Sequence, residues 1–109
     1  MNNDISSYLD KFDNQTVQRF YSIHELIFGS TSKKIDEKLW AKLPSYYVED
    51  RFIRIIPFKD HINIEANAVP FYKEELSEYK ITPKGMLQIF HNQPIPIKLL
   101  EEIFKKTLE

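Results

Sequence analysis

The chain has 109 residues, of which 42% are hydrophobic and 14% aromatic, a size and composition typical of one folded domain. It contains no cysteine, which excludes disulfides, thiolate metal sites and cysteine nucleophiles. Its 15 basic and 16 acidic residues are spread evenly, so no basic stripe of the kind that binds nucleic acid is present.

The N-terminus lacks the basic and apolar segments of a secretory signal, and no apolar run approaches the roughly 20 residues that span a bilayer. We therefore expect a single cytoplasmic domain over residues 1–109, with neither a membrane nor a nucleic acid as its partner. The sequence leaves the oligomeric state open.

Two amphipathic segments open the chain. A short helix is predicted over residues 4–11, with Asp4 as its cap. A second helix starts at Asp13 or Asn14, either of which can cap it, and Gly29 stands where a C-terminal cap belongs. We interpret His24 as a packed or boundary residue of this helix. The apolar face recurs at three- and four-residue steps and comprises Val17, Phe20, Tyr21, His24, Ile27 and Phe28.

From Leu39 to Glu65 the apolar pattern changes to a period of two, which indicates strands with one apolar face. Turns are predicted at Pro44–Ser45, at Glu49–Asp50 and at Lys59–Asp60, and the last of these closes a tight hairpin. The segment therefore contains three to four strands.

The last third of the chain alternates between helix and strand signals. Pro70 suits the first turn of a short helix over residues 70–78. A turn over residues 82–85 leads to a strand over residues 86–90. Pro96 opens a final helix, in which the apolar stripe is Ile97, Leu100, Ile103 and Phe104 and the last turn carries Lys105 and Lys106.

This order of elements predicts an α+β fold in two layers, with a small antiparallel sheet of about four to five strands packed on the N- and C-terminal helices. The alternation assigns one set of residues to the face that the helices cover: Ile53, Ile55, Ile62, Ile64, Leu87 and Ile89. It assigns a second set to the opposite, partly solvated face: Arg54, His61, Asn63, Glu65, Gln88 and part of Phe90.

The polar face offers two kinds of site. His61 and Glu65 carry groups that can ligate iron or another divalent metal. Arg54 is expected to point the same way, and because a guanidinium repels a metal ion, the face suits an anion better. The candidate ligand-binding residues here are Arg54, Lys59, His61, Asn63 and Gln88. The alternative is an ordinary solvated sheet face.

A second candidate lies in the turn before the last strand. Lys80 and Lys84 flank it, and Gly85 lets the backbone approach a ligand, so the lysines can meet a phosphate or a carboxylate. The alternative is a turn glycine beside exposed lysines.

Aromatic residues are dense between positions 40 and 58. They are either an exposed patch that marks a partner or ligand surface, or they are covered by the helix over residues 70–78. The residues are Trp40, Tyr46, Tyr47, Phe52 and Phe58.

Four segments together resemble the YdhG-like family of small bacterial domains. They run from Ile35 through KLPSYY (42–47), RIIPFKDHINI (54–64), YKITPKGMLQIF (79–90) and PIPIKLLEEIF (94–104). Two motifs carry the resemblance: F-K-x-H beginning at Phe58, and K-x-x-x-K-G-x-L-Q beginning at Lys80. The resemblance implies a small antiparallel sheet backed by helices, the arrangement expected above from the pattern.

The resemblance also implies a role, because some members of that family are described as frataxin-like iron chaperones that pass iron to iron–sulfur or haem assembly. Frataxins carry an acidic ridge on the first helix and the neighbouring strand. The corresponding acidic residues here are Asp4, Asp10 and Asp13, with Lys11 among them.

No serine or threonine lies in a G-x-S-x-G elbow, so we predict that the protein is not an enzyme. Two functions remain as hypotheses. The first is an iron-binding chaperone, with iron as the cofactor that the resemblance implies. The second is a metal-free binding module that holds an anionic small molecule or a protein segment on the polar sheet face.

Overall fold

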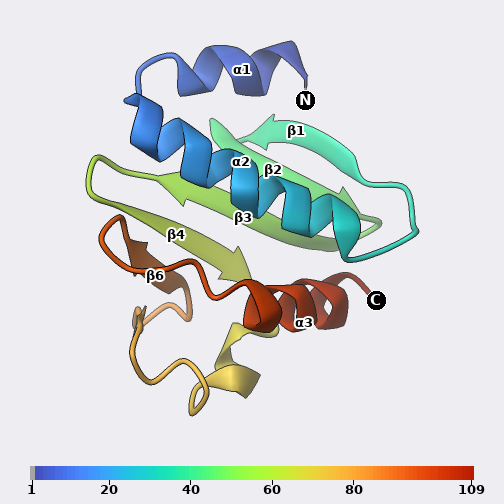
Figure 1. The fold of residues 1–109 in the computed structure, drawn as a ribbon. Helices are drawn as coiled ribbons and strands as arrows, with labels where there is room; N and C mark the ends of the chain where they lie inside the picture. Colours follow the sequence, from blue (N-terminus) through green and yellow to red (C-terminus); the bar gives the residue numbers. More distant parts are fainter. Residues whose placement is uncertain (1) are drawn as a thin grey trace.

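The computed structural model describes residues 2–109. Two helices open the chain, a run of strands follows, and a third helix closes it (Figure 1). The helical elements are α1 (Asn3–Leu9), α2 (Asn14–Gly29), the 3-10 helix η1 (Val69–Tyr72) and α3 (Ile97–Leu108). The strands are β1 (Asp36–Trp40), β2 (Leu43–Val48), β3 (Arg51–Pro57), β4 (His61–Ala66), β5 (Lys80–Ile81) and β6 (Leu87–Phe90).

Within residues 2–109 the strands form one six-stranded antiparallel sheet in the order β1-β2-β3-β4-β6-β5. The predicted α+β class is therefore confirmed, although the expected strand number was too low. Strand β5 has only two residues, too few for an alternation to be visible in the sequence. Strand β1 begins in the charged segment Asp36–Lys38, where no apolar pattern points to it.

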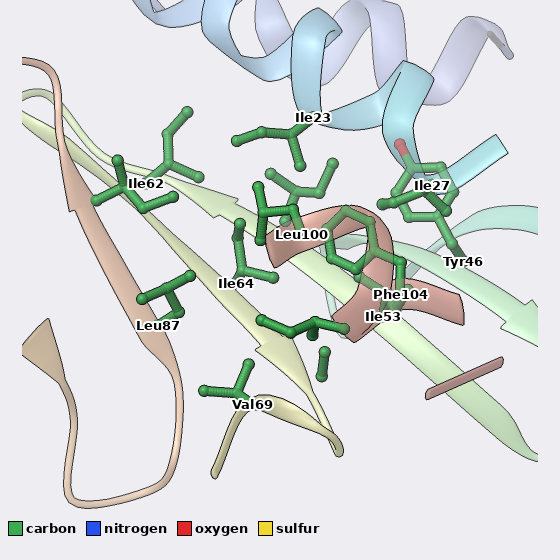
Figure 2. Packing of buried hydrophobic residues seen from close by; sticks show 14 of the residues in the cluster. Ile23, Ile27, Tyr46, Ile53, Ile62, Ile64, Val69, Leu87, Leu100 and Phe104 are labelled. Carbon is green, nitrogen blue, oxygen red and sulfur yellow. The ribbon is translucent and has the colours of Figure 1, made fainter. Parts of the chain in front are cut away.

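The helices lie on one face of the sheet, in front of it in Figure 1. Helices α2 and α3 both contact β3 and β4, and they contact each other. The core fills the space between these layers, as Figure 2 shows for Ile53, Ile64 and Phe104. Each residue that the alternation assigned to the covered face is buried: Ile53, Ile55, Ile62, Ile64, Leu87 and Ile89.

The turn between β1 and β2 lies at Ala41 and Lys42, which have positive φ angles of 50° and 66°. Positive φ at both central residues is typical of the two-residue turns that join twisted strands. The predicted turn at Pro44–Ser45 is wrong, because both residues belong to β2 and pair with β1. Pairing of β2 with β3 begins only at Ser45, so the missing N–H of Pro44 removes no hydrogen bond from that ladder.

The other predicted turns are confirmed. Glu49 and Asp50 join β2 to β3, and Lys59 and Asp60 lie in the hairpin between β3 and β4. Gly85 has a φ of 88°, a conformation that favours glycine, and its N–H donates to the carbonyl of Thr82 at 2.8 Å.

Helix ends differ from the predictions in two places. Asn2, not Asp4, caps α1, since its side chain accepts from the N–H of Ile5. Asp13 caps α2 as expected, but the cap at its other end is Ser30 in a right-handed conformation, so the predicted glycine cap is wrong. Burial also gives α2 a rotated apolar face, which comprises Thr16, Phe20, Ile23 and Ile27.

The segment predicted as a helix over residues 70–78 forms only the short 3-10 helix η1 and a series of turns. Helix α3 starts after Pro96 as predicted, and Leu100, Ile103 and Phe104 are buried, whereas Ile97 is exposed. Among the described residues, no helix combines the length and apolar character that crossing a bilayer requires.

Candidate functional site

The face of the sheet opposite the helices is called the open face here. Strand register places the predicted polar residues on it together, because directly paired residues share a face. Arg54 pairs with Glu65, and Asn63 pairs with Gln88. The open face comprises Asp36, Lys38, Trp40, Leu43, Ser45, Tyr47, Phe52, Arg54, Ile56, His61, Asn63, Glu65, Lys80, Gln88 and Phe90.

Arg54 is the centre of a closed cluster on this face. Only 6% of it is exposed. Its guanidinium carbon lies 4.1 Å from the ring centre of Trp40 and 3.9 Å from that of Phe52, so the two rings flank it. Stacking of this kind is favourable for a guanidinium.

The N–H groups of Arg54 are directed at three further neighbours. They donate to the hydroxyl of Ser45 at 3.1 Å, to the hydroxyl of Tyr47 at 2.8 Å and to the carboxylate of Glu65 at 3.0 Å. The charge is therefore neutralised by Glu65 and screened from solvent by aromatic rings. The anion that the sequence places at Arg54 would have to compete with this internal carboxylate.

His61 is held by a different set of contacts. Its Nδ1 lies 2.6 Å from a carboxylate oxygen of Asp60, and this hydrogen bond lowers the pKa of Asp60. The ring stacks on Phe58, with 4.5 Å between centres, and lies 5.5 Å from that of Phe90.

The two predicted metal ligands are not brought together. Residues four apart in a strand are separated by about 13 Å, so His61 and Glu65 do not reach one ion at bonds of roughly 2 Å. Within residues 2–109 no group of three or more histidine, aspartate or glutamate side chains is placed to hold a metal ion.

The remaining open-face candidates differ in their surroundings. The Oδ1 atom of Asn63 is buried and has no hydrogen-bond partner among the described residues. Lys59 does not join Arg54. It lines a shallow basin of about 800 Å³ with Asp13 and His91, at the end of the sheet near the start of α2.

The aromatic cluster is divided between the two faces. Tyr46 is fully buried on the helix side, whereas Trp40 and Phe58 are 50% and 42% exposed. The open face therefore does carry exposed aromatic rings, and Phe90, at 37%, adds one that the sequence assigned there only in part.

Lys84 and Gly85 lie in a cleft of about 630 Å³ that borders the Arg54 cluster at Phe52 and Glu65. It is found where β3 begins and β4 ends, between the turn over residues 82–85 and the last turn of α3. We call it the end cleft. Its lining comprises Asp50, Arg51, Phe52, Glu65, Ala66, Asn67, Pro70, Lys84, Gly85, Lys106, Thr107 and Glu109.

The cations of the end cleft are less engaged than Arg54. Neither Lys84 nor Lys106 has a carboxylate within 4.0 Å in the described part of the chain. The ammonium of Lys106 lies 5.1 Å from the ring centre of Phe71. Arg51 donates a hydrogen bond to a main-chain oxygen of Glu109, which draws its guanidinium toward the end of α3.

Sequence reasoning identified one side of this cleft and missed the other. The glycine after Lys84 pointed to a turn that can approach a ligand, and that turn lines the cleft. Lys106 was interpreted only as a favourable charge near a helix C-terminus, and Arg51 was not considered. No spacing links residues this far apart in the chain, so their meeting depends on the fold.

The other histidines have structural partners. His24 is half-buried, as predicted, and its Nε2 lies 2.6 Å from the Glu37 carboxylate beneath α1. Burial and this carboxylate raise the pKa of the neighbouring Tyr46. His91 is half-buried, and its Nε2 lies 3.0 Å from the Thr16 hydroxyl.

Comparison with known proteins gives no match: no family model, no curated protein and no solved structure is significantly similar to the chain. The resemblance to the YdhG-like family therefore stays a prediction, and the functional argument depends on the site itself.

Proposed function

We propose that this protein is a non-enzymatic, metal-free binding module that holds an anionic small molecule in the end cleft. The observation that carries the proposal is the pair Lys84 and Lys106. They come from two different elements and line one cleft, and neither has a carboxylate partner within 4.0 Å among residues 2–109. The volume, about 630 Å³, is within the usual range for small-molecule sites.

The physical reason is the energy of an unpaired charge. An anion 4 Å from an ammonium gains about 1 kcal/mol in water and about 4 kcal/mol at the effective dielectric constant of a protein surface. Arg54 offers no comparable gain, because Glu65 already lies 3.0 Å from it. The positive φ at position 85 favours glycine, and because Gly85 has no side chain the turn leaves the cleft open there.

The alternative iron-chaperone function receives less support from the geometry. An iron ion in the end cleft would be attracted by Asp50 but would meet Lys84, Lys106 and Arg51 as repelling neighbours. On the open face His61 and Glu65 are each engaged, the first with Asp60 and the second with Arg54.

The proposal is tested by NMR titration of isotope-labelled protein with citrate and, separately, with inorganic phosphate. We expect saturable shifts of the Lys84 and Gly85 amides and a Kd below about 10 mM for at least one anion. The double variant Lys84→Gln/Lys106→Gln should weaken binding by about tenfold or more, because two charge pairs are lost.

Lys98→Gln is the matched control. Lys98 is exposed on the same helix as Lys106, eight residues or about 12 Å away along the axis, and it does not line the cleft. Its replacement should leave the Kd unchanged. Equal weakening by the control, or no binding of either anion by the wild type, would remove the proposal.

The proposal that the protein binds no metal is tested separately, by an anaerobic titration with ferrous iron. We expect no saturable binding tighter than about 0.1 mM, which corresponds to roughly 5 kcal/mol. Tighter binding that His61→Ala abolishes would favour the chaperone instead.

A further inference from the structure

Two charged side chains of the end cleft that have no ion-pair partner among residues 2–109 lie on either side of β4. Lys84 lies on one side, in the turn that precedes β6, and Asp50 lies on the other, in the turn that precedes β3. Strands β3 and β6 both pair with β4, on opposite edges of it. Neighbouring strands are about 4.8 Å apart, so the two sides of the cleft are separated by roughly 10 Å.

Further contacts strengthen this division. The side chain of Pro70 lies next to Gly85, and Lys106 lies over the ring of Phe71, so the turn that carries Lys84 and the ammonium of Lys106 both lie beside η1. Arg51 follows Asp50 in the chain, but its hydrogen bond to Glu109 directs it toward α3.

The carboxylates in the cleft are not equivalent. Glu65 is neutralised by Arg54, and the side chain of Glu109 accepts a hydrogen bond from Thr31 at 2.8 Å. Asp50 has no ion-pair or hydrogen-bond partner for its carboxylate among residues 2–109. It is therefore the carboxylate that is left to attract a cationic group of a ligand.

From this arrangement we infer that the ligand of the end cleft is a zwitterion, with a carboxylate that meets Lys84 and Lys106 and an ammonium group that meets Asp50. This inference rests on the proposed anion-binding function and narrows its ligand class. A simple anion gains from the lysines but places no group near Asp50. A molecule with both charges gains at both sides, and its length must bridge part of the roughly 10 Å between them.

The test uses two ω-amino acids and the matched acids that lack the amine. The probes are 4-aminobutyrate against butyrate, and 6-aminohexanoate against hexanoate, each titrated by NMR into the wild-type chain. We expect at least one amino acid to bind about tenfold more tightly than its matched acid. Asp50→Asn should bring that ratio close to one while leaving the affinity for the simple acid unchanged.

Two variants make the outcomes distinguishable. Lys84→Gln should weaken the amino acid and the matched acid alike, because both present a carboxylate. Asp10→Asn, which changes an exposed aspartate outside the cleft, should alter neither affinity.

Equal affinity of the amino acid and its matched acid would overturn the zwitterion inference and leave the proposed function intact. A preference for the amino acid that persists in Asp50→Asn would also overturn the inference. Absence of binding by all four probes together with citrate and phosphate would instead remove the proposed function itself.

Discussion

Two regions of this molecule present cations near the same end of the sheet, and they differ in what already surrounds the charge. Arg54 is buried between Trp40 and Phe52 and paired with Glu65. The lysines of the end cleft face a cavity and have no carboxylate within 4.0 Å in the described part of the chain. We therefore propose that the lysines of the end cleft bind a ligand, whereas the paired Arg54 stabilises the fold.

The largest expected effect separates these two roles. Arg54→Ala should lower the free energy of unfolding by about 3 kcal/mol, because it removes a buried pair and the packing of two rings. Urea unfolding measures the loss. Citrate titration of the folded double variant Arg54→Ala/Glu65→Gln, which leaves no unpaired carboxylate at position 65 of the cleft, should give the wild-type Kd. A stability within about 0.5 kcal/mol of wild type would contradict the structural role of Arg54.

Ionic strength should affect ligand binding in the end cleft more than it affects the stabilisation by Arg54. Raising the salt concentration from roughly 0.01 M to 1 M shortens the Debye length from about 30 Å to about 3 Å. Citrate binding in the exposed end cleft should weaken by at least about fivefold across this range, while the destabilisation caused by Arg54→Ala stays nearly constant. Salt-independent binding would show that the contact with the lysines is not electrostatic.

Asp13 and Asp60 extend the comparison to carboxylates that the fold itself satisfies. Hydrogen bonds from Thr16 hold the pKa of Asp13 below its usual value of 3.8, and the hydrogen bond with His61 does the same for Asp60. Their stabilisation is therefore complete above pH 3.8 and is lost as the pH falls through the lower folded pKa.

Thermal unfolding between pH 6 and about pH 2 tests this expectation. Asp13→Asn keeps a capping side chain but cannot titrate, so its melting temperature should fall less steeply below pH 3.8 than that of the wild type. If the melting temperatures of the two proteins fell equally below pH 3.8, Asp13 would not contribute to the pH dependence of stability.

The smallest effect concerns Lys42, which lies outside the cleft and has no ion-pair partner among residues 2–109. Its φ of 66° is strained for a side chain, so Lys42→Gly should raise the free energy of unfolding by about 0.5–1 kcal/mol. Urea unfolding should detect the gain, and the citrate Kd should not change. Weaker citrate binding in this variant would mean that any exposed lysine suffices and that the end cleft is not special.

The sequence predicted the fold well in segments where apolar residues recur with the period of the secondary structure. Alternation from Ile53 to Ile64 placed four isoleucines on the covered face, namely Ile53, Ile55, Ile62 and Ile64. It placed Arg54 and His61 together on the other face. It failed at the first hairpin, because Ala41 and Lys42 adopt positive φ without the glycine or asparagine that normally marks such a turn.

The candidate site was less predictable for a different reason. Alternation places Arg54 and Glu65 on one face, but only the register pairs them directly, and that pairing decides that the guanidinium is occupied. The end cleft joins residues near positions 50, 84 and 106, which are brought together by the order of β3, β4 and β6 and by the path of α3. The spacing of residues along the chain does not predict that these three positions lie close together.

The central claim is that Lys84 and Lys106 together hold an anion. The most direct measurement compares the citrate Kd of the wild type with that of Lys84→Gln/Lys106→Gln, using the amide shift of Gly85 as the signal. A Kd raised by about tenfold or more in the double variant, with Lys98→Gln unchanged, is the predicted result. An equal Kd in all three proteins, or shifts that occur around Arg54 instead of Gly85, would contradict it.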